Sequence, residues 1–345
     1  MKVKVKDIAK VAGVSSTTVS LVLNHKPSRI AEETKEHIFR IAREMQFQKE
    51  SEVDFSEFKR VKTLGMIVPD NKNPFYYQLS AEVAKCAHLN DYTVFQCYTG
   101  DDIQRFYAAI ESLMAKNVDG LIIIPPETMD KENVKLLKSV QKSRIPFMLL
   151  DRAAYNVFCD FVTADNKHGG RIATEYLIKN GHRRIGCLAG AANIYTSRKR
   201  VEGYQEALAA YQIPFEKSFL FYGHYNLDSG YAGAKELIEK GMTAIIAGND
   251  LMAYGVYLFA RDQGMSIPED ISVIGYDNTD LCRLMDAPLT SIDQNLGTMA
   301  AKAIEVILRQ IKIRDEKGGQ EPARNYYFTP YIVERGSVKD VSIRK

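Results

Sequence analysis

The 345-residue sequence lacks any long apolar run. No stretch approaches the ~20 apolar residues that a membrane-spanning helix requires, so we expect no association with a membrane. The N-terminus, Met-Lys-Val-Lys-Val-Lys-Asp, has no apolar segment of the kind found in secretory signals, and we expect a cytoplasmic protein. Apolar residues make up 46% and charged residues 26% of the chain, a globular composition that excludes collagen, a coiled coil and a largely disordered chain.

Cysteine is scarce and scattered. The five cysteines, an odd number with no close pair, are Cys86, Cys97, Cys159, Cys187 and Cys282. This distribution argues for free thiols in a reducing compartment rather than for a disulfide framework. Neither the cysteines nor the histidines have the spacing of a metal site, so we expect no bound metal and no cofactor.

Enzymatic signatures are missing as well. The sequence contains no Gly-x-Gly-x-x-Gly after a strand, no Gly-x-x-x-x-Gly-Lys-Ser/Thr and no Gly-x-Ser-x-Gly. No set of hydroxyl, imidazole and carboxylate groups suggests a nucleophile with its base. We therefore predict that the protein is not an enzyme.

The net charge of +3 is unevenly distributed. Residues 1–49 carry ten Lys/Arg against five Asp/Glu, a balance of +5, whereas residues 50–58 carry four acidic residues and no basic one. Lys59, Arg60 and Lys62 then restore positive charge. A small basic unit of this kind is typical of a nucleic-acid-binding domain, although a basic patch alone is a weak indication.

The basic unit has the pattern of three short amphipathic helices. We expect them over Lys6–Ala12, Thr17–Asn24 and Glu32–Gln46. Gly13 is placed to end the first helix, and Ser15 or Ser16 is placed to cap the second. Two helices joined by a tight turn that contains glycine form a helix-turn-helix.

From residue 62 onward, short apolar runs alternate with helical stretches. The runs are Leu64–Val68, Thr93–Cys97, Gly120–Ile124, Pro146–Leu150, Arg184–Ala189, Phe219–Tyr222, Thr243–Ala247 and Ile271–Gly275. The helical stretches include Tyr77–Leu89, Ile103–Lys116, Gly170–Lys179 and Ala253–Gln263. This alternation indicates parallel strands with both faces covered. About ten strand–helix units exceed one sheet, so we predict an α/β fold with two doubly wound lobes and a ligand cleft between them.

We therefore divide the chain into four parts. They are a three-helix, helix-turn-helix head over 1–46, a hinge or linker over 47–62, a two-lobed domain over 63–336, and a short tail over 337–345. The tail is too short for an additional heptad bundle.

Polar residues gather in the loops that follow the apolar runs. These loops contain Pro69–Phe75, Asp151-Arg152, Arg198 with Arg200, Asn249-Asp250 and Tyr276–Asn278. Carboxylates, amides and guanidinium groups that converge with aromatic rings suit a sugar, whose vicinal hydroxyls form bidentate hydrogen bonds and whose C–H face packs on a ring.

The motifs of the chain, taken in order, resemble the lactose-repressor/galactose-repressor family of bacterial transcription regulators. The segment Val5–Asn24 matches the helix-turn-helix signature of that family nearly residue for residue. Further motifs match at Asp119–Ile123, Ile145–Arg152, Gly181–Ile185, Arg200–Tyr204, Asn249-Asp250, Pro268–Asp277 and Leu289–Ser291. The resemblance covers almost the whole chain.

This resemblance implies a transcriptional repressor whose head over 1–46 binds double-stranded DNA at a pseudo-palindromic operator. It also implies that the periplasmic-binding-protein-like domain over 63–336 binds the effector and forms the homodimer, and the short tail favours a dimer over a tetramer. An effector in the cleft, which we expect to be a sugar, would change the angle between the lobes and thereby the affinity for DNA. The resemblance places Ser16, Thr17 and Leu21 at base edges. It places a second set near the phosphates: Ser15, Thr18, Ser20, Asn24, Thr34 and Lys35.

The resemblance also implies a set of effector contacts in the cleft: Phe75, Asp151, Arg152, Arg200, Tyr225, Asn249, Asp277 and Gln294. Arg200 and Asp277 are expected to bind pairs of hydroxyls, and Asn249 to bridge. Phe75 and Tyr225 are expected to stack on the ligand. For Asp151-Arg152, a plain ion pair at the end of a strand stays an alternative.

The chain departs from the family pattern in two places. The family hinge follows an Ala-Arg-x-Leu pattern, whose leucine wedges into the minor groove. An ungapped alignment places Val53, Asp54 and Ser56 at the alanine, arginine and leucine positions, so the wedge leucine is missing. Phe55 or Phe58 would replace that wedge only in a shifted register. At position 21, many relatives have a basic or polar residue, whereas a leucine meets only apolar features such as a thymine methyl group.

Other functions stay open at this point. A three-helix unit of this size also serves as a protein-interaction module. A sugar-binding protein without effective DNA specificity would have a similar two-lobed domain. A regulator of the same fold could also respond to a purine or to a partner protein, as some members of the family do.

Overall fold

The computed structural model describes residues 3–24, 28, 30–45, 47, 61–127, 134–143, 145–154, 156–317 and 321–342. These residues form two compact units that divide between Arg60 and Val61. We name the first unit the head and the second the body, and describe each by itself. The hinge positions Val53, Asp54 and Ser56, together with Phe55 and Phe58, lie outside the described residues.

The head contains three helices, as predicted: α1 (Val5–Ala12), α2 (Ser16–Leu23) and α3 (Glu32–Glu44). Gly13 ends α1 in the left-handed region, with φ of 66°. There the Val14 amide donates to the carbonyl of Ala9 at 3.1 Å. Ser15 caps α2 by accepting a hydrogen bond from the Thr18 amide at 3.0 Å. The glycine turn and the serine cap therefore set the helix-turn-helix geometry.

The interior of the head is small. Its buried apolar side chains come from all three helices: Ile8, Ala9, Val19, Val22, Ile38, Ile41 and Ala42. Full burial of an isoleucine or valine contributes roughly 1.5–3 kcal/mol, and the alanines contribute less. These few side chains hold the three helices together.

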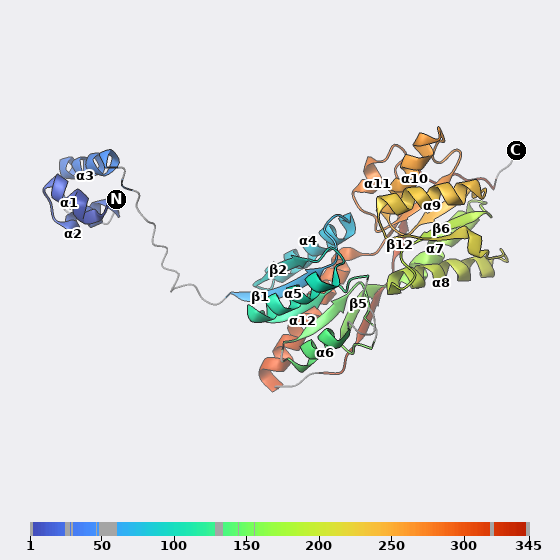
Figure 1. Cartoon of the computed structure of the whole chain (residues 1–345), viewed down its shortest axis with the longest axis horizontal. Helices are drawn as coiled ribbons and strands as arrows, with labels where there is room; N and C mark the ends of the chain where they lie inside the picture. The colour runs from blue at the N-terminus through green and yellow to red at the C-terminus, as the bar shows by residue number, and fades with distance from the viewer. Residues whose placement is uncertain are drawn as a thin grey trace. The chain divides into compact units, whose positions relative to one another are not determined.

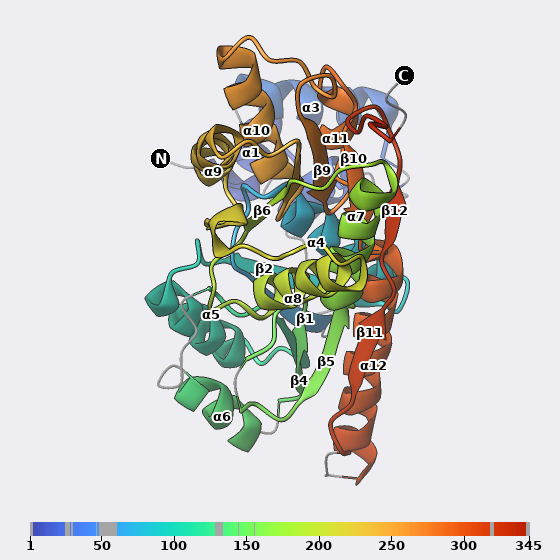
Figure 2. The same ribbon diagram turned by 90° about the vertical axis from the view of Figure 1, so that its right-hand side faces the viewer.

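The first lobe of the body, the N-lobe, is a six-stranded parallel sheet with the strand order β11-β5-β4-β3-β1-β2. Its strands are β1 (Lys62–Val68), β2 (Tyr92–Tyr98), β3 (Gly120–Ile123), β4 (Phe147–Leu150), β5 (Asp160–Ala164) and β11 (Asn325–Phe328). Helices α4 (Pro74–His88) and α12 (Leu296–Lys317) pack on one face of the sheet (Figure 2). Helices α5 (Ile103–Ala115) and α6 (Val134–Lys142) pack on the other face.

The second lobe, the C-lobe, has the strand order β12-β10-β9-β8-β6-β7, in which only β12 is antiparallel to its neighbour. Its strands are β6 (Ile185–Ala189), β7 (Leu220–Tyr222), β8 (Ala244–Ala247), β9 (Ser272–Tyr276), β10 (Thr290–Asp293) and β12 (Tyr331–Val333). A 3₁₀ turn spans Lys217–Phe219, and the helices are α7 (Asn166–Lys179), α8 (Tyr195–Ala210), α9 (Leu227–Glu239), α10 (Asp250–Asp262) and α11 (Leu281–Leu284). Helices α7 and α8 cover one face, and α9 and α10 cover the other (Figure 1).

The predicted α/β architecture with two doubly wound lobes is confirmed. All eight predicted strands are present, with ends that differ by one or two residues. Four strands were not predicted: β5, β10, β11 and β12. The chain crosses between the lobes three times, after β5, after β10 and between β11 and β12. These three crossover segments connect the two lobes on either side of the cleft.

The predicted tail over 337–345 is described as far as Ser342, and it packs on the C-lobe. The buried Ser337 hydroxyl donates to the carbonyl of Val273 at 2.6 Å and accepts from the Thr290 amide at 2.8 Å. Further along, the Lys339 carbonyl lies 3.1 Å from Nε2 of His182. These contacts hold the described part of the tail against the C-lobe.

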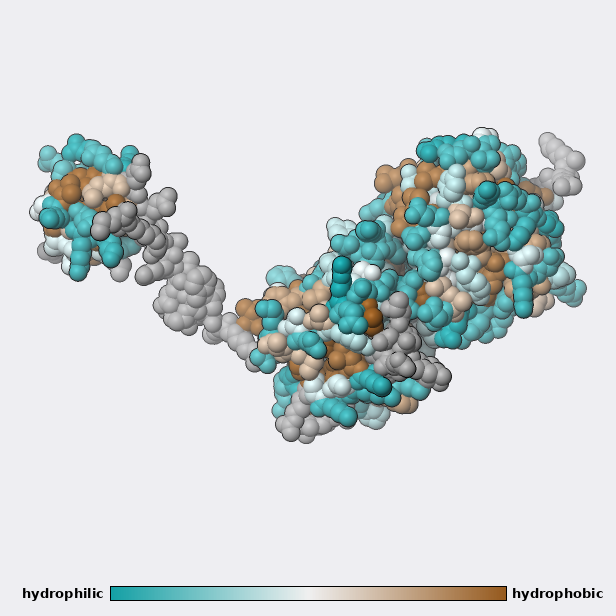
Figure 3. Space-filling view, in the orientation of Figure 1, coloured by the Kyte–Doolittle hydropathy of each residue, from teal (hydrophilic) through white to brown (hydrophobic). Residues whose placement is uncertain are grey.

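The surface of the body is mostly hydrophilic on the face shown in Figure 3, with small hydrophobic patches. None of the helices in the described part of the chain combines the length and the hydropathy of a membrane-spanning segment. All five cysteines are free thiols, and Cys187 and Cys282 are buried.

Candidate functional site

A small cavity lies in the cleft where the two lobes meet. Its N-lobe wall consists of Asn73, Phe75, Tyr76 and Asp151, and its C-lobe wall consists of Thr196, Arg200, Tyr225, Asn249 and Asp277. The structure thus brings six of the eight predicted effector residues together around one cavity. The other two, Arg152 and Gln294, lie behind its walls.

The cavity lies at the carboxyl ends of the parallel strands, where α/β sheets bind ligands. Asp151 directly follows β4, and Asp277 directly follows β9. Asn73 caps α4 through the Phe75 amide at 3.0 Å, and Asn249 caps α10 through the Met252 amide at 2.8 Å. The amino ends of these two helices bring partial positive charge to a cavity that also holds two carboxylates.

Three residues that line the cavity have a positive φ, a backbone conformation that residues other than glycine rarely adopt. The φ angles are 61° at Asp151, 54° at Tyr225 and 106° at Asp277. Each such conformation costs of order 1–3 kcal/mol and persists where the surrounding structure holds it. Their concentration around one cavity supports a functional role for that cavity.

Asp151 offers an unused hydrogen-bond acceptor to the cleft. Its Oδ2 accepts from the Tyr76 hydroxyl at 3.3 Å, whereas its buried Oδ1 has no partner within the described residues. Burial raises the pKa of Asp151 above its ordinary value, against the opposing effects of Arg152 and Arg200. A buried carboxylate oxygen without a partner is costly, so a ligand hydroxyl at this point would satisfy it.

Asp277 is held in place from behind by Gln294. The side chain of Gln294 is fully buried, and its Nε2 donates to Oδ1 of Asp277 at 2.6 Å. On the cleft side, Nη2 of Arg200 lies 4.0 Å from the same oxygen. Burial raises the pKa of Asp277 well above its ordinary value, although Arg200 opposes the shift. Gln294 is therefore placed to orient Asp277 rather than to line the cavity.

Arg200 is fixed by hydrogen bonds on two sides and by an aromatic face. Its Nε donates to Oδ1 of Asn166 at 2.8 Å, and its Nη1 donates to the carbonyl of Gly248 at 2.5 Å. The guanidinium group lies 3.5 Å from the ring centroid of Tyr276. Burial alone would lower the pKa of Arg200, but Tyr225, Tyr276 and the nearby carboxylates raise it, so the group stays charged.

The Tyr225 ring fills a slot that only small residues allow. A side chain at Gly190 would come within 2.2 Å of the ring, and one at Gly248 within 3.2 Å. The Tyr225 hydroxyl lies 3.4 Å from Oγ1 of Thr196. Asn249 also fixes this segment, because its Nδ2 donates to the Tyr225 carbonyl at 3.0 Å.

Arg152 points away from the cavity. Its Nη1 donates to Asp101 at 2.9 Å and to the carbonyl of Pro125 at 3.2 Å, and its Nη2 lies 3.6 Å from Glu127. Glu127 also reaches across the cleft, where its Oε2 lies 3.7 Å from Nδ1 of His224. The structure thus places Arg152 in an ion-pair network with Asp101 and Glu127.

Sequence reasoning missed three residues that line the cavity, namely Asn73, Tyr76 and Thr196. Asn73 belongs to the polar loop after the first predicted strand, so the loop was identified but the side chain was not. Tyr76 directly follows Phe75 and packs edge-on against it, with ring centroids 5.0 Å apart. Thr196 carries no sequence signal beyond its place at the start of α8.

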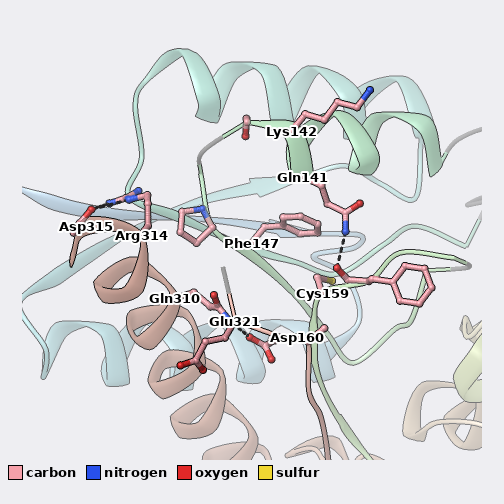
Figure 4. A pocket seen from close by; sticks show the side chains of 13 residues that line it. Gln141, Lys142, Phe147, Cys159, Asp160, Gln310, Arg314, Asp315 and Glu321 are labelled. Atoms are coloured by element: carbon pink, nitrogen blue, oxygen red, sulfur yellow. Dashed lines mark hydrogen bonds and ion pairs between the residues drawn. The ribbon is translucent and has the colours of Figure 1, made fainter. Parts of the chain in front are cut away.

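The cleft cavity is narrow, with a volume of about 20 Å³. A much larger cavity of about 730 Å³ lies elsewhere, at the amino ends of β4 and β5 in the N-lobe (Figure 4). Several of its polar side chains are paired with one another: Gln310 donates to Asp160 at 2.6 Å, and Arg314 donates to Asp315 at 2.8 Å. No described side chain that lines it has a buried polar atom without a partner, so the cleft is the better candidate.

The predicted DNA-contacting residues lie on one part of the head. The exposed side of α2 carries Thr17 and Asn24, together with the partly exposed Leu21. Several of the predicted hydroxyls bond to near neighbours. Ser15 Oγ lies 2.8 Å from Thr18 Oγ1, and Asn24 Nδ2 donates to Ser20 Oγ at 3.2 Å.

The remaining predicted contacts flank this surface. Ser16 begins α2, and Thr34 and Lys35 lie in the first turn of α3. Lys35 pairs with Glu32 at 2.8 Å in an exposed ion pair. All nine side chains are at least partly exposed. Because a hydroxyl can both donate and accept, the bonded serine and threonine groups keep hydrogen-bonding capacity for a phosphate.

Comparisons with known proteins match both units of the chain. Residues 4–50 match the profile of bacterial regulatory proteins of the lacI family. Residues 61–330 match the profile of periplasmic binding proteins and the sugar-binding domain of the LacI family. The HTH-type transcriptional repressor PurR of Aliivibrio fischeri (strain MJ11) is 31% identical over 339 residues, which cover 97% of this chain and 98% of the relative.

Solved structures have the same fold. A LacI-family transcriptional regulator from Enterococcus faecium with bound ribose is 28% identical with a TM-score of 0.70, over 81% of this chain and all of that one. The lac repressor dimer bound to operator and the anti-inducer ONPF is 24% identical with a TM-score of 0.69, over 98% of this chain and all of that one. With both units matched in order along the chain, the protein belongs to the LacI family of bacterial regulatory proteins.

Proposed function

We propose that the chain is a cytoplasmic transcriptional repressor, and not an enzyme, that binds a pseudo-palindromic operator as a homodimer. We further propose that its effector is a neutral, polyhydroxylated small molecule, a sugar, held in the cleft between the lobes. The unpartnered carboxylate oxygen of Asp151 carries the effector proposal, because it faces a cavity whose other wall holds Arg200 and Asp277.

The polar groups of the cleft favour a neutral ligand rich in hydroxyls. Asp151 and Asp277 can accept from hydroxyl groups, whereas they would repel a carboxylate or a phosphate. Arg200 is the cation that lines the cavity in the described structure, and it is already held by Asn166 and Gly248. Phe75 and Tyr225 offer aromatic surface for the C–H face of a sugar ring.

A purine is the second candidate, because the same aromatic rings would stack on a flat base. The similarity to PurR repressors favours it. Titration calorimetry with D-ribose, D-glucose, cellobiose, hypoxanthine and guanine separates the two classes. We expect heat of binding from at least one sugar and none from the purines; the reverse result would replace the sugar by a purine.

The narrowness of the cavity supports coupling between effector and DNA. A cavity needs roughly 10–15 Å³ to hold one water molecule, so about 20 Å³ leaves no room for a sugar. Entry of the ligand would therefore require the lobes to part, and a ligand that prefers one lobe angle shifts the protein toward it. A homodimer transmits such a change to both heads.

DNA binding is tested by selection of a random duplex library on the full-length protein at physiological salt. We expect enrichment of a two-fold symmetric site, as protein symmetry imposes on operators. Binding that is sequence-blind and strongly salt-dependent would contradict the repressor function, because it would reflect phosphate contacts alone. The affinity of the selected duplex is then measured with and without the sugar that calorimetry identifies.

A further inference from the structure

The hydrogen bonds around Arg200 lead to a residue outside the cavity. We propose that Asn166 is a positioning residue, which holds the effector-binding Arg200 to the first crossover between the lobes and so couples cleft occupancy to lobe angle. The coupling part of this inference rests on the proposed function of the cleft. The positioning part rests on the geometry alone.

Asn166 lies at the junction of the lobes. It is the first residue of α7 in the C-lobe, two residues beyond the end of β5 in the N-lobe, and it is 2% exposed. Its Nδ2 donates backward to the carbonyl of Ala164 at 3.0 Å and lies 3.4 Å from Oγ1 of Thr163. Its Oδ1 accepts from Nε of Arg200 at 2.8 Å. One amide therefore bonds to both lobes.

The same chain of contacts reaches both carboxylates of the cleft. On the N-lobe side, the Thr163 hydroxyl donates to the backbone carbonyl of Asp151 at 2.9 Å. On the C-lobe side, Arg200 lies 4.0 Å from Asp277. Along this path, Asp151, Thr163, Asn166 and Asp277 are buried, and the side chain of Arg200 is 11% exposed. Buried hydrogen bonds of this kind are costly to break and therefore transmit position.

Two glycines make the contact between Asn166 and Arg200 possible. A Cβ at Gly170 on α7 would lie 2.1 Å from the backbone oxygen of Arg200 itself. A Cβ at Gly203 on α8 would lie 1.9 Å from the backbone oxygen of Lys167. These close approaches lock α8 against α7, the helix that begins with Asn166, and the two helices lie side by side in Figure 2.

A rotation of the lobes must change backbone angles in the crossover residues next to Asn166. Its acceptor oxygen would then shift relative to β5, and the guanidinium group of Arg200 would follow it or lose the bond. By thermodynamic reciprocity, a ligand that holds Arg200 in one position favours the lobe angle that matches it. Asn166 would thus act through Arg200 and would not touch the effector.

Four variants of the full-length protein separate these roles. Asn166→Ala removes both halves of the link. Asn166→Asp keeps an acceptor for Arg200 but loses the donor toward Ala164 and Thr163. Thr163→Val removes the hydroxyl that bonds Asp151. Thr174→Val is the matched control, because Thr174 is equally buried and its hydroxyl donates to the helix carbonyl of Gly170 at 2.7 Å, away from Asp151 and Arg200.

The first measurement needs no effector. In protein labelled with ¹⁵N-arginine, the Nε–H signal of Arg200 is assigned by its loss in Arg200→Lys, and its exchange with water is timed. We expect at least tenfold faster exchange in Asn166→Ala, and exchange close to wild type in Asn166→Asp, Thr163→Val and Thr174→Val. Unchanged protection of this proton in Asn166→Ala would overturn the positioning role.

The second measurement uses D-ribose and cellobiose as probes, together with the selected duplex. We expect Asn166→Ala to weaken sugar binding by about 10- to 100-fold, the usual loss for a hydrogen bond to a charged group. Asn166→Asp and Thr163→Val should keep sugar affinity within about threefold, yet bring the ratio of DNA affinities with and without sugar closer to one. Full retention of that ratio in both variants would overturn the coupling role.

The two proposals fail in different ways. If neither probe nor any other sugar binds the wild-type protein, the sugar effector is refuted, while the exchange of the Arg200 proton still decides whether Asn166 positions it. If Asn166→Ala does not fold, as judged by its thermal transition, Thr163→Val still tests the link to Asp151.

Discussion

The head and the cleft of the body present their functional groups in opposite ways. On the head, the predicted contacts are hydroxyl, amide and apolar side chains on an exposed helix, and α2 carries no charged residue. In the cleft, the two carboxylates of Asp151 and Asp277 are buried on residues with positive φ, and the guanidinium group of Arg200 is largely buried beside them. The head depends on a small apolar interior, whereas the cleft depends on a large scaffold that tolerates the cost of burying charge.

This difference shows where each region is vulnerable. A head of about 45 residues is near the lower limit of size for an independent fold, so one cavity removes most of its stability. The body has four separate apolar clusters around two sheets and can absorb the same loss. The following predictions test this contrast, from the largest expected effect to the smallest.

The largest effect is expected from Ile38→Ala in α3, where the isoleucine is fully buried. The cavity should cost about 2–5 kcal/mol, which is enough to unfold the head. DNA binding to the selected duplex should then be lost, while the thermal transition of the body stays where it is. Differential scanning calorimetry and gel-shift titration measure the two results.

The matched variant in the body is Ile304→Ala, which makes the same change on a buried helix face. It should lower the transition temperature of the body by several degrees and leave DNA binding in place. If Ile38→Ala kept full DNA affinity, the head would have a larger free energy of unfolding than the cavity removes, and the contrast with the body would be wrong.

A smaller loss is expected where α7 meets α8. Gly170→Ala would place a methyl group 2.1 Å from the Arg200 backbone oxygen, so the helices must separate at a cost of about 1–3 kcal/mol. In Gly170→Ala, the affinity for the effector should fall together with the free energy of unfolding, because the separation of the helices displaces Arg200.

Gly297→Ala in α12 is the control. The heavy atom nearest to the added methyl group, on Glu82, is 3.9 Å away, so this variant should be neutral or slightly stabilising. Equal losses in both variants would refute the role of the close approach.

Much of the fold was predictable because burial leaves a direct trace in the sequence. The eight predicted strands are mostly apolar segments flanked by helical periodicity, and such segments stand out along a chain. The end of α1 followed from Gly13, and the cap of α2 was predicted as Ser15 or Ser16, of which the structure uses Ser15. Strand β11, by contrast, alternates exposed and half-buried residues, and β12 has three residues and no buried one, so neither forms a continuous apolar run.

The sequence predicted which loops form the site, but it did not predict the direction in which each side chain points. Asp151 and Arg152 are neighbours in sequence, yet one faces the cavity and the other turns toward Asp101 and Glu127, which lie 51 and 25 positions earlier in the chain. Gln294 likewise contacts Asp277 across 17 positions and lies behind it. Such directions depend on which distant segments fold against a loop, and local pattern does not contain that information.

The acidity of Asp277 offers a way to compare stability with function in the cleft. Burial raises the pKa of Asp277 well above its unfolded value, so between those two pKa values the folded state binds more protons than the unfolded state. The protonated group therefore contributes stability at low pH that is lost as the pH rises through the folded pKa. Asp277→Asn should stabilise the protein at pH 7 by roughly 0.5–2 kcal/mol, and weaken binding of the effector.

Urea denaturation of both proteins from pH 4 to pH 8 measures this effect. The stability difference between Asp277→Asn and wild type should be small at pH 4 and should grow with pH, because Gln294 can donate to the asparagine oxygen in the variant as well. A difference that shrinks as the pH rises would mean that ionised Asp277 stabilises the fold.

The smallest effect is expected from Leu21 on the head. Leu21 is partly exposed and does not join the apolar cluster of the head, unlike Val19, Val22 and Leu23 of the same helix. An outward leucine can recognise a thymine methyl group in the major groove, and burial of one methyl contributes about 0.8 kcal/mol, or about fourfold in affinity per half-site.

Replacement of each thymine of the selected duplex in turn by deoxyuridine should reveal one such position. The variant Leu21→Ala should lose affinity for the thymine duplex but not for the duplex with deoxyuridine at that position. The control is Val11→Ala on α1, where the valine is 60% exposed, and it should bind both duplexes like wild type. An equal loss on both duplexes would mean that Leu21 supports the helix rather than reads a base, and the uncharged face of α2 would then recognise DNA through its hydroxyl and amide groups alone.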